Sequence, residues 1–294
     1  MAEAEVVIPR ELGIRLSSLF MFDKLVFVEG PSDEDVLREW ASILGVNLAQ
    51  ESVGFVSMGG VRNLAHFASE RTLAFLTKRR VYMWFVLDRD EREEEEIRRL
   101  TNSLGDQASL NVLQRREIEN YLIVTRPVAD FIKLKRELGS ATDRTRPDES
   151  NLAAAIEECA ETLKQATLER RVAKWGCVPF YVDRKSVLDA SGGRPIIERL
   201  NAKFEDLRLK LAENQQSIER VIEENQRDLD SRWHVEKTHL VPGDLLLDEV
   251  CKRFGVRFIK EKDSARLAAL MRKDEVAPDI RSLLEGIRDK RSPD

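Results

Sequence analysis

The segment from Val81 to Leu87 (VYMWFVL) constrains the fold of this chain more than any other feature. It is apolar almost throughout, without the alternation of a strand that has one face in water. Such a run is typical of a central strand in a parallel sheet that helices cover on both faces. The run stops at Asp88-Arg89-Asp90, so a polar loop follows the strand. We therefore expect an α/β domain.

Three further segments predict the rest of the sheet: Lys24 to Val28, Val53 to Val56 and Leu110 to Leu113. Helical spacing follows the first of them in Val36, Leu37 and Trp40, and the second in the region of Leu64 to Leu76. Strands that alternate with helices at this spacing form parallel sheets with right-handed crossovers. An acidic helix from about Glu93 to Leu104 separates the third strand from the fourth.

Past Pro127 the β signal fades and helical periodicity dominates. One helix is expected from Asn151 to Lys174. A second carries apolar residues at alternating steps of three and four from Ile197 to Val221, with Asn214 and Asn225 in register, which is a heptad seam with polar interruptions. An antiparallel helical hairpin that packs on itself is the simpler interpretation. An arm for dimerisation or for a partner is the alternative.

Bulk properties exclude several classes of protein. The 294 residues include 48 Lys and Arg against 53 Asp and Glu, a net charge of −5, so any contact with nucleic acid must come from local patches or metal ions. Three cysteines without close spacing argue against a disulfide framework and a zinc site, which favours a reduced, cytoplasmic chain. The apolar stretch from Leu19 to Val28 contains Asp23 and Lys24, and fits neither a signal peptide nor a membrane span.

Acidic and glycine residues follow each predicted strand. In parallel sheets the functional loops lie beyond the carboxyl ends of the strands, so we expect these residues to share one edge. They are Glu29, Asp33, Gly59, Gly60, Asp88, Asp90 and either Glu117 or Glu119. Carboxylates at one edge can hold Mg²⁺ or Mn²⁺ for phosphodiester hydrolysis. Asp88 and Asp90 would point the same way in an extended segment. Asp33 could instead only cap the following helix.

The ordered motifs VEGPSDEDVL, Gly59-Gly60, Asp88-Arg89-Asp90 and RREIENYL resemble the Toprim domain of topoisomerases, bacterial primases and small RNA-maturation nucleases. They are most similar to the OLD (overcoming lysogenization defect) nucleases, over roughly Phe22 to Tyr121. The resemblance implies a metal-dependent DNA nuclease with two ions, and a helical domain inserted in a Toprim-like parallel sheet flanked by helices. We accordingly expect a Toprim domain in residues 1–125 and 235–294, and the helical insertion in residues 126–234.

The resemblance also implies roles for individual residues. Glu29 would be a metal ligand and would also serve general acid or base steps. Asp33, Asp88 and Asp90 would complete the metal sites, and Glu117 or Glu119 would support the second ion. OLD-like enzymes commonly bring a lysine to the site in a Gly-Lys context, but this chain has Pro242-Gly243-Asp244. Lys237 is the nearest substitute for a catalytic lysine, and a solvated surface lysine is the alternative interpretation.

Basic and small residues near the strand ends are candidates for contact with nucleic acid. The expected set is Ser57, Gly59, Gly60, Arg62, Arg115 and Arg116. Contacts of arginine with phosphate would make binding depend on salt. As isolated clusters, the arginines are equally compatible with an ordinary surface.

The family likeness implies an ABC-type ATPase, yet no G-x-x-x-x-G-K-[ST] motif occurs in the chain. We therefore expect that ATPase either in the same longer chain or as a separate subunit, as in two-gene phage-defence systems, with a homodimer left open. Two alternatives to a DNA nuclease remain at this stage. One is an RNA-processing or primase-like enzyme on the same fold, and the other is a non-catalytic subunit that binds nucleic acid or the ATPase.

Overall fold

The computed structural model describes residues 22–60, 81–102, 104, 108–139, 144–176 and 195–290. The helix expected between Leu64 and Leu76, and the candidate residue Arg62, lie outside the described residues. Cys159 and Cys251 are free, buried thiols. Among the described helices, none combines the length and the apolar composition needed to cross a bilayer.

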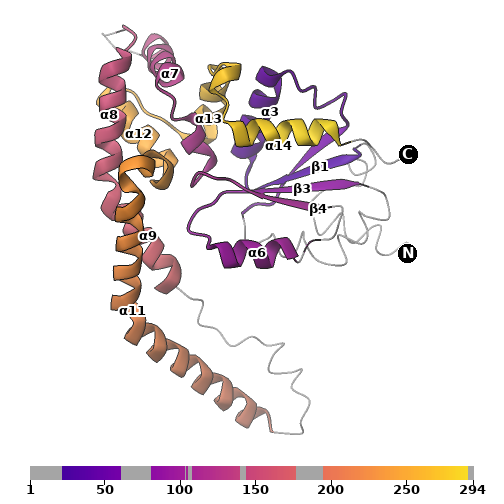
Figure 1. The fold of residues 1–294 in the computed structure, drawn as a ribbon, viewed down its shortest axis with the longest axis vertical. Helices are drawn as coiled ribbons and strands as arrows, with labels where there is room; N and C mark the ends of the chain where they lie inside the picture. Colours follow the sequence, from indigo (N-terminus) through magenta and orange to yellow (C-terminus); the bar gives the residue numbers. More distant parts are fainter. Residues whose placement is uncertain are drawn as a thin grey trace. The chain divides into compact units, whose positions relative to one another are not determined.

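The sheet has four parallel strands in the order β2-β1-β3-β4 (Figure 1). They are β1 (Lys24–Val28), β2 (Val53–Ser57), β3 (Tyr82–Leu87) and β4 (Ala108–Val112). The expected α/β fold with a parallel sheet is confirmed, and the strand bounds differ from the predicted ones by at most two residues. Since all strands run the same way, the loops after β1, β2, β3 and β4 meet at one edge.

Aromatic and aliphatic side chains on alternate positions of the central strands form the core on one face. Phe27 of β1 stacks on Phe85 of β3 with ring centroids 4.6 Å apart, and both are fully buried. Leu25, Met83 and Leu87 belong to the same buried cluster. This pattern follows from the period of two along a strand, which sends every second side chain to the same face.

Helices cover both sides of the sheet (Figure 1). On one side lie α3 (Pro31–Leu44), α13 (Lys260–Ala269) and α14 (Pro278–Asp289), and on the other lies α6 (Glu94–Asn102). Trp40 of α3 is fully buried and its indole N–H points to the sulfur of Met271 at 3.3 Å. The segment after α13 thus packs beside α3.

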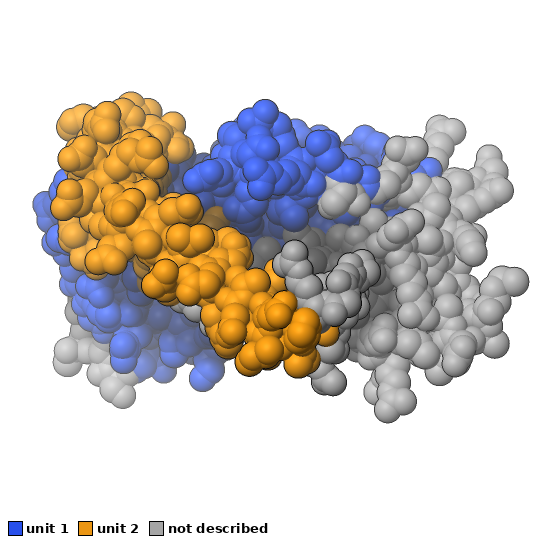
Figure 2. All heavy atoms as spheres, turned by 90° about the horizontal axis from the view of Figure 1, so that it is seen from below, with its two compact units in different colours: residues 1–162, 238–294 blue, residues 163–237 orange. Residues whose placement is uncertain are grey.

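The chain divides into two compact units, coloured separately in Figure 2. The first contains residues 1–162 and 238–294, and the second contains residues 163–237. The first unit also includes η2 (Ile118–Leu122), α7 (Thr125–Leu138), α8 (Glu149–Thr162), α12 (Gly243–Arg253) and η3 (Lys273–Glu275). Helices α7 and α8 therefore cluster with the sheet, although the sequence places the start of the insertion at residue 126. A compact unit need not coincide with an inserted domain, so those boundaries stay a prediction.

The second unit consists of α9 (Lys164–Gly176) and most of α11 (Ile196–Leu240). Lys164 forms an ion pair with Asp230, and Arg171 forms one with Asp228, so the two helices pack side by side. The single helix expected from Asn151 to Lys174 is wrong, because α8 ends at Thr162 and α9 starts anew at Lys164. The Thr162 hydroxyl donates a hydrogen bond to the Cys159 carbonyl, a local bond that competes with a continuing helix.

Candidate functional site

Glu29 and Asp33 lie in the loop between β1 and α3 and in the first turn of that helix. The Gly30 N–H donates to Asp33 Oδ2 at 2.8 Å, so Asp33 helps to start α3 from inside its first turn, while the N-cap itself is Gly30. Asp33 is nevertheless 7% exposed, and its surroundings include other carboxylates. Capping and a role in a cation site therefore do not exclude each other here.

Asp88 follows β3 directly and connects two loops of the sheet edge. Its backbone N–H donates to Glu29 Oε1 at 3.0 Å, and its Oδ1 accepts a hydrogen bond from the Ile118 N–H at 2.9 Å. The loops after β1 and β3 thus meet, as expected for neighbouring parallel strands. The start of η2 is joined to the same place.

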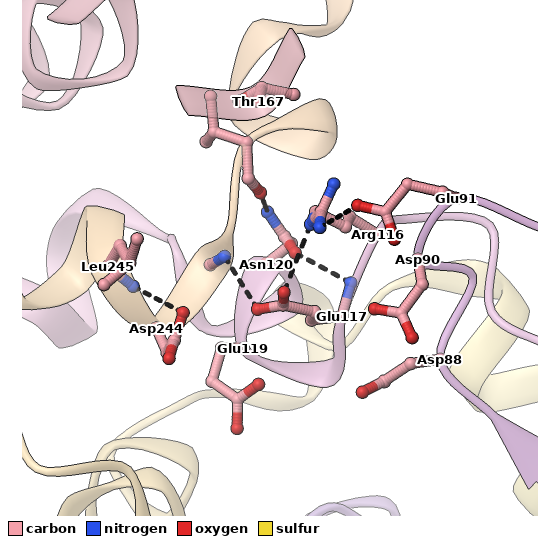
Figure 3. A network of polar contacts seen from close by, with 12 residues as sticks. Asp88, Asp90, Glu91, Arg116, Glu117, Glu119, Asn120, Thr167, Asp244 and Leu245 are labelled. Atoms are coloured by element: carbon pink, nitrogen blue, oxygen red, sulfur yellow. Dashed lines mark hydrogen bonds and ion pairs between the residues drawn. The ribbon is translucent and has the colours of Figure 1, made fainter. Parts of the chain in front are cut away.

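Asp90 does not have the extended backbone from which the direction of its side chain was predicted. Its φ is +44°, which is the left-handed region, so strand alternation does not apply at this residue. Its N–H donates to the Arg116 carbonyl at 2.8 Å. Figure 3 shows the carboxyl groups of Asp88 and Asp90 near each other, although the reason is a turn and not a strand.

The carboxylates of this edge influence one another strongly. Burial raises the pKa of Asp88 well above its usual value, and the nearby charges of Asp33, Glu119 and Glu29 raise it further. Burial also raises the pKa of Glu29 and of Asp33, and the Asp90 charge adds to both increases. We call Glu29, Asp33, Asp88, Asp90 and Glu119 the acidic cluster. Burial is the largest cause of the raised pKa of Glu29, Asp33, Asp88 and Glu119.

Two basic side chains reach into the acidic cluster. Arg92, with a side chain only 3% exposed, lies 3.3 Å from Glu29 Oε1 and 3.5 Å from Asp90 Oδ2, and it donates to the Asp88 carbonyl. Lys260, at the start of α13, forms a 2.9 Å ion pair with Glu119 Oε2. Sequence reasoning missed both, because Arg92 is hidden in an acidic stretch and Lys260 is distant along the chain.

Glu119 is fully buried in η2, and its environment explains its protonation behaviour. Burial raises the pKa of Glu119 to about 7, although the Lys260 ammonium opposes the increase. Burial by itself lowers the pKa of Lys260, but Glu119, Asp88 and Asp33 together raise it above its ordinary value. The lysine therefore stays charged and neutralises part of the acidic cluster.

Glu117, the other candidate for the second ion, has both carboxylate oxygens occupied. Oε1 accepts from Arg116 Nε at 3.1 Å, and Oε2 accepts from the Gly243 N–H at 3.0 Å (Figure 3). Arg116 is buried between Glu117 and Glu91. These bonds describe a structural network, while the expected roles of Glu117 in metal binding and of Arg116 in nucleic-acid binding stay predictions.

The remaining candidates for contact with nucleic acid divide into two groups. Ser57 is the last residue of β2, Gly59 and Gly60 follow it at the same edge, and the Gly60 N–H donates to the Glu29 carbonyl at 2.9 Å. Gly59 and Gly60 have φ values of +68° and +107°, which explains the glycine pair. Arg115 lies with its guanidinium 4.6 Å from the centre of the Tyr121 ring and donates to the Asn120 carbonyl, so it packs on its own loop.

The expected catalytic lysine, Lys237, lies near the end of α11 in the second unit, whereas the acidic cluster and Lys260 lie in the first. Its role stays a prediction, and Lys260 is a second candidate that the structure adds. In the part of the chain that the structure describes, no three Asp, Glu, His or Cys side chains form a ready-made metal site. The oxygen donors of the clustered carboxylates suit a hard divalent cation. Coordination would require side chains of the cluster to rearrange.

Comparison with known proteins identifies part of the chain. Residues 20–90 match the family model described as overcoming lysogenization defect protein-like, TOPRIM domain. No curated protein and no solved structure matches significantly. The matched segment contains Glu29, Asp33, Asp88 and Asp90, and it ends before η2 and α13. Residues 20–90 are therefore an OLD-like Toprim region, the type of domain found in metal-dependent enzymes that process nucleic acids.

Proposed function

We propose that this protein is a metal-dependent nuclease that cuts or nicks DNA at the acidic cluster. The observation that carries the proposal is the meeting of Glu29, Asp33 and Asp88 at the carboxyl edge of the sheet, where burial and then neighbouring carboxylates raise the pKa of each. A site that concentrates negative charge attracts cations, and carboxylates are the ligands that Mg²⁺ and Mn²⁺ prefer. The match of this segment to the Toprim family supports the same chemistry.

Each residue of the cluster has a proposed task. Glu29, Asp33 and Asp88, with Asp90, would hold one cation, and Glu119, with or without Glu117, would hold a second. When bound, such ions supply a nucleophilic hydroxide near neutral pH and stabilise charge on the phosphate. Glu29 lies beside the Asp88 N–H and would also accept or return a proton. Lys260, which pairs with Glu119, would offset the charge of the phosphate.

The loop of Ser57, Gly59 and Gly60 is proposed to bind the substrate backbone beside the cluster, together with Arg62. Its link to the Glu29 carbonyl places it next to the first candidate cation site. An ABC-type ATPase, in the same longer chain or as a separate cytoplasmic subunit, is the proposed partner. Defence against phages is the proposed setting, and both proposals rest on the likeness of the Toprim region to the OLD group.

A nicking assay tests this function. Supercoiled plasmid is incubated with the protein and Mn²⁺ or Mg²⁺, and the loss of supercoiled DNA is followed over time. Glu29→Gln and Asp88→Asn should lower the rate at least about a hundredfold, because each removes a ligand or a proton carrier. Glu95→Gln and Asp206→Asn, on exposed helix faces, are the matched controls. Nicking that survives in both cluster variants would refute the proposal.

A non-catalytic subunit is the second candidate, and one observation favours it. Arg92 and Lys260 already neutralise carboxylates of the cluster, and no ready-made metal site exists among the described residues. Such a protein would bind DNA or RNA without cleaving either one at any concentration of metal. Running the same assay with a labelled RNA in parallel separates this candidate, and an RNA-processing enzyme, from a DNA nuclease.

A further inference from the structure

The short helix η2 joins the acidic cluster to the end of the long helix α11. One side of η2 contributes Glu119 to the cluster, and its first N–H, from Ile118, binds Asp88 Oδ1. The other side holds Asn120, which is completely buried. The same five residues therefore touch the candidate cation site and the segment Thr238–Gly243, which runs from the last turn of α11 to the first residue of α12.

The Asn120 amide uses both of its donors and its oxygen in this position. Its Nδ2 donates to the Thr238 carbonyl at 2.8 Å and to the Val241 carbonyl at 2.9 Å. Its Oδ1 accepts from the Glu117 N–H at 2.8 Å. The two carbonyls lie at the point where α11 ends, and a helix end leaves its last carbonyls without partners inside the helix. Asn120, which lies 118 positions before Thr238 in the sequence, supplies the missing donors.

Two further bonds fix the same connection. The Arg116 N–H donates to the His239 carbonyl at 3.0 Å, and the Gly243 N–H donates to Glu117 Oε2 at 3.0 Å. Gly243 has no room for a side chain, because a Cβ there would lie 2.6 Å from the backbone nitrogen of Asn120. This close approach explains why glycine stands at position 243. It also means that η2 and the start of α12 cannot shift independently.

We propose that Asn120 is a positioning residue which couples cation binding at the acidic cluster to the conformation of the segment Thr238–Gly243. Cations bound at Asp88 and at Glu119 would move or stiffen η2, because Asp88 accepts from its first N–H and Glu119 belongs to it, and the buried hydrogen bonds of Asn120 would pass this change to the end of α11. Coupling between two sites is reciprocal, so a change at the end of α11 alters cation affinity by the same factor. The inference deepens the proposed function and rests on it, because it assigns a control point to the same site.

Hydrogen exchange of the unaltered protein gives the first test. Amide exchange is measured with and without Mn²⁺, and the proposal predicts slower exchange at residues 238–243 when Mn²⁺ is present. The end of α14, which carries Gly286, serves as the internal reference and should not change. Unchanged exchange at residues 238–243, in a protein that Mn²⁺ stabilises against heat, would overturn the coupling and leave the proposed function intact.

Two variants give the second test. Asn120→Ala removes the bonds to Thr238 and Val241, and Gly243→Ala forces η2 away from α12. Each should weaken Mn²⁺ affinity, read from the Mn²⁺ dependence of the melting temperature, by about tenfold or more, as is usual when a group that orients metal ligands is lost. Gly286→Ala, where a Cβ would meet nothing within 4 Å, and Asn225→Ala, whose amide bonds only within α11, are the controls.

The outcomes separate the two proposals. Folded variants that bind Mn²⁺ as tightly as the unaltered protein would overturn the coupling alone. An unaltered protein whose melting temperature does not respond to Mn²⁺ at all would overturn the proposed function, and the coupling with it. If both variants fail to fold, the exchange experiment on the unaltered chain still decides the matter.

Discussion

Lys260 carries a single positive charge and lies close to several carboxylates of the acidic cluster. It pairs with Glu119 at 2.9 Å, and the charges of Asp88 and Asp33 also act on it. A lysine in this position can perform the task expected of a lysine in a Gly-Lys context, although it comes from α13. Asp244, which follows Gly243 in this chain, adds a negative charge near Glu117 instead.

We predict that Lys260→Met lowers the rate of metal-dependent nicking by about a hundredfold or more, the usual cost of losing one preorganised group that stabilises the transition state. Lys237→Met should leave the rate within about threefold of the unaltered protein if Lys260 has the catalytic role. Lys262→Met, on the exposed side of the same helix, is the control. If Lys237→Met lowers the nicking rate and Lys260→Met does not, Lys237 has the catalytic role.

The raised pKa of Glu119 predicts how the stability of the protein depends on pH in the absence of divalent cations. Its pKa is about 7 in the folded chain against an ordinary value of 4.5, so between these pH values the folded chain binds more protons than the unfolded chain. The free energy of unfolding should therefore fall as the pH rises from about 4.5 to 7. The raised pKa values of Glu29, Asp33 and Asp88 act in the same direction.

Urea unfolding at several pH values, with a chelator present, measures this dependence. Glu119→Gln should flatten the decrease, and Glu137→Gln, on the exposed surface of α7, should leave it unchanged. A free energy of unfolding that rises across this range would contradict the assignment. If Glu119→Gln does not alter the pH dependence of the free energy of unfolding, Glu119 is not its cause.

At the scale of elements, the strands were predictable because each is a short apolar run that ends in a polar loop. The same logic placed Glu29, Asp33 and Asp88 at one edge, since parallel strands end together. Arg92 and Lys260 were not predictable, because their positions depend on how α13 packs beside α3 and on a turn after β3. The break between α8 and α9 was also hidden, since the apolar stripe continues across Thr162.

Helix α11 has one exposed part, which carries most of its heptad seam, and one packed part, which begins near Val221 and continues beyond the seam. Leu229 is fully buried and Trp233 is 3% exposed, whereas Leu211 is 46% exposed. Lys164 and Arg171 of α9 pair with α11 at Asp230 and Asp228, so the two helices pack on each other beyond the seam, as in a helical hairpin. For the exposed part of the seam, the interpretation as an arm for dimerisation or for a partner remains a prediction.

We predict that Leu229→Ala lowers the free energy of unfolding by about 2–5 kcal/mol, the usual cost of a cavity at a buried leucine. Leu211→Ala, the same substitution in the same helix at an exposed position, should cost less than about 1 kcal/mol. Urea unfolding followed by circular dichroism compares the two. Equal losses would show that the exposed part of the seam is also packed in solution.

For the whole molecule, the net charge determines whether DNA is attracted or repelled as it approaches. The chain carries −5, and the acidic cluster adds a local concentration of negative charge at the proposed site. Phosphates are repelled by both, so the charged arginines near the loops must act against an unfavourable background. Divalent cations in the cluster would reverse the sign of the local field. DNA binding and cation binding should therefore depend on each other.

We predict that the protein binds a labelled duplex at least about tenfold more tightly with Ca²⁺ than with a chelator, because a bound oxygen-liganded cation bridges carboxylate and phosphate. Fluorescence anisotropy measures the affinity, and a gel of the same samples shows whether the duplex stays intact. NaCl added to the same ionic strength is the control, and it should weaken binding, because salt screens contacts with phosphate. Asp88→Asn should abolish most of the Ca²⁺ effect. Binding that Ca²⁺ and NaCl change alike would show that DNA recognition does not pass through the acidic cluster.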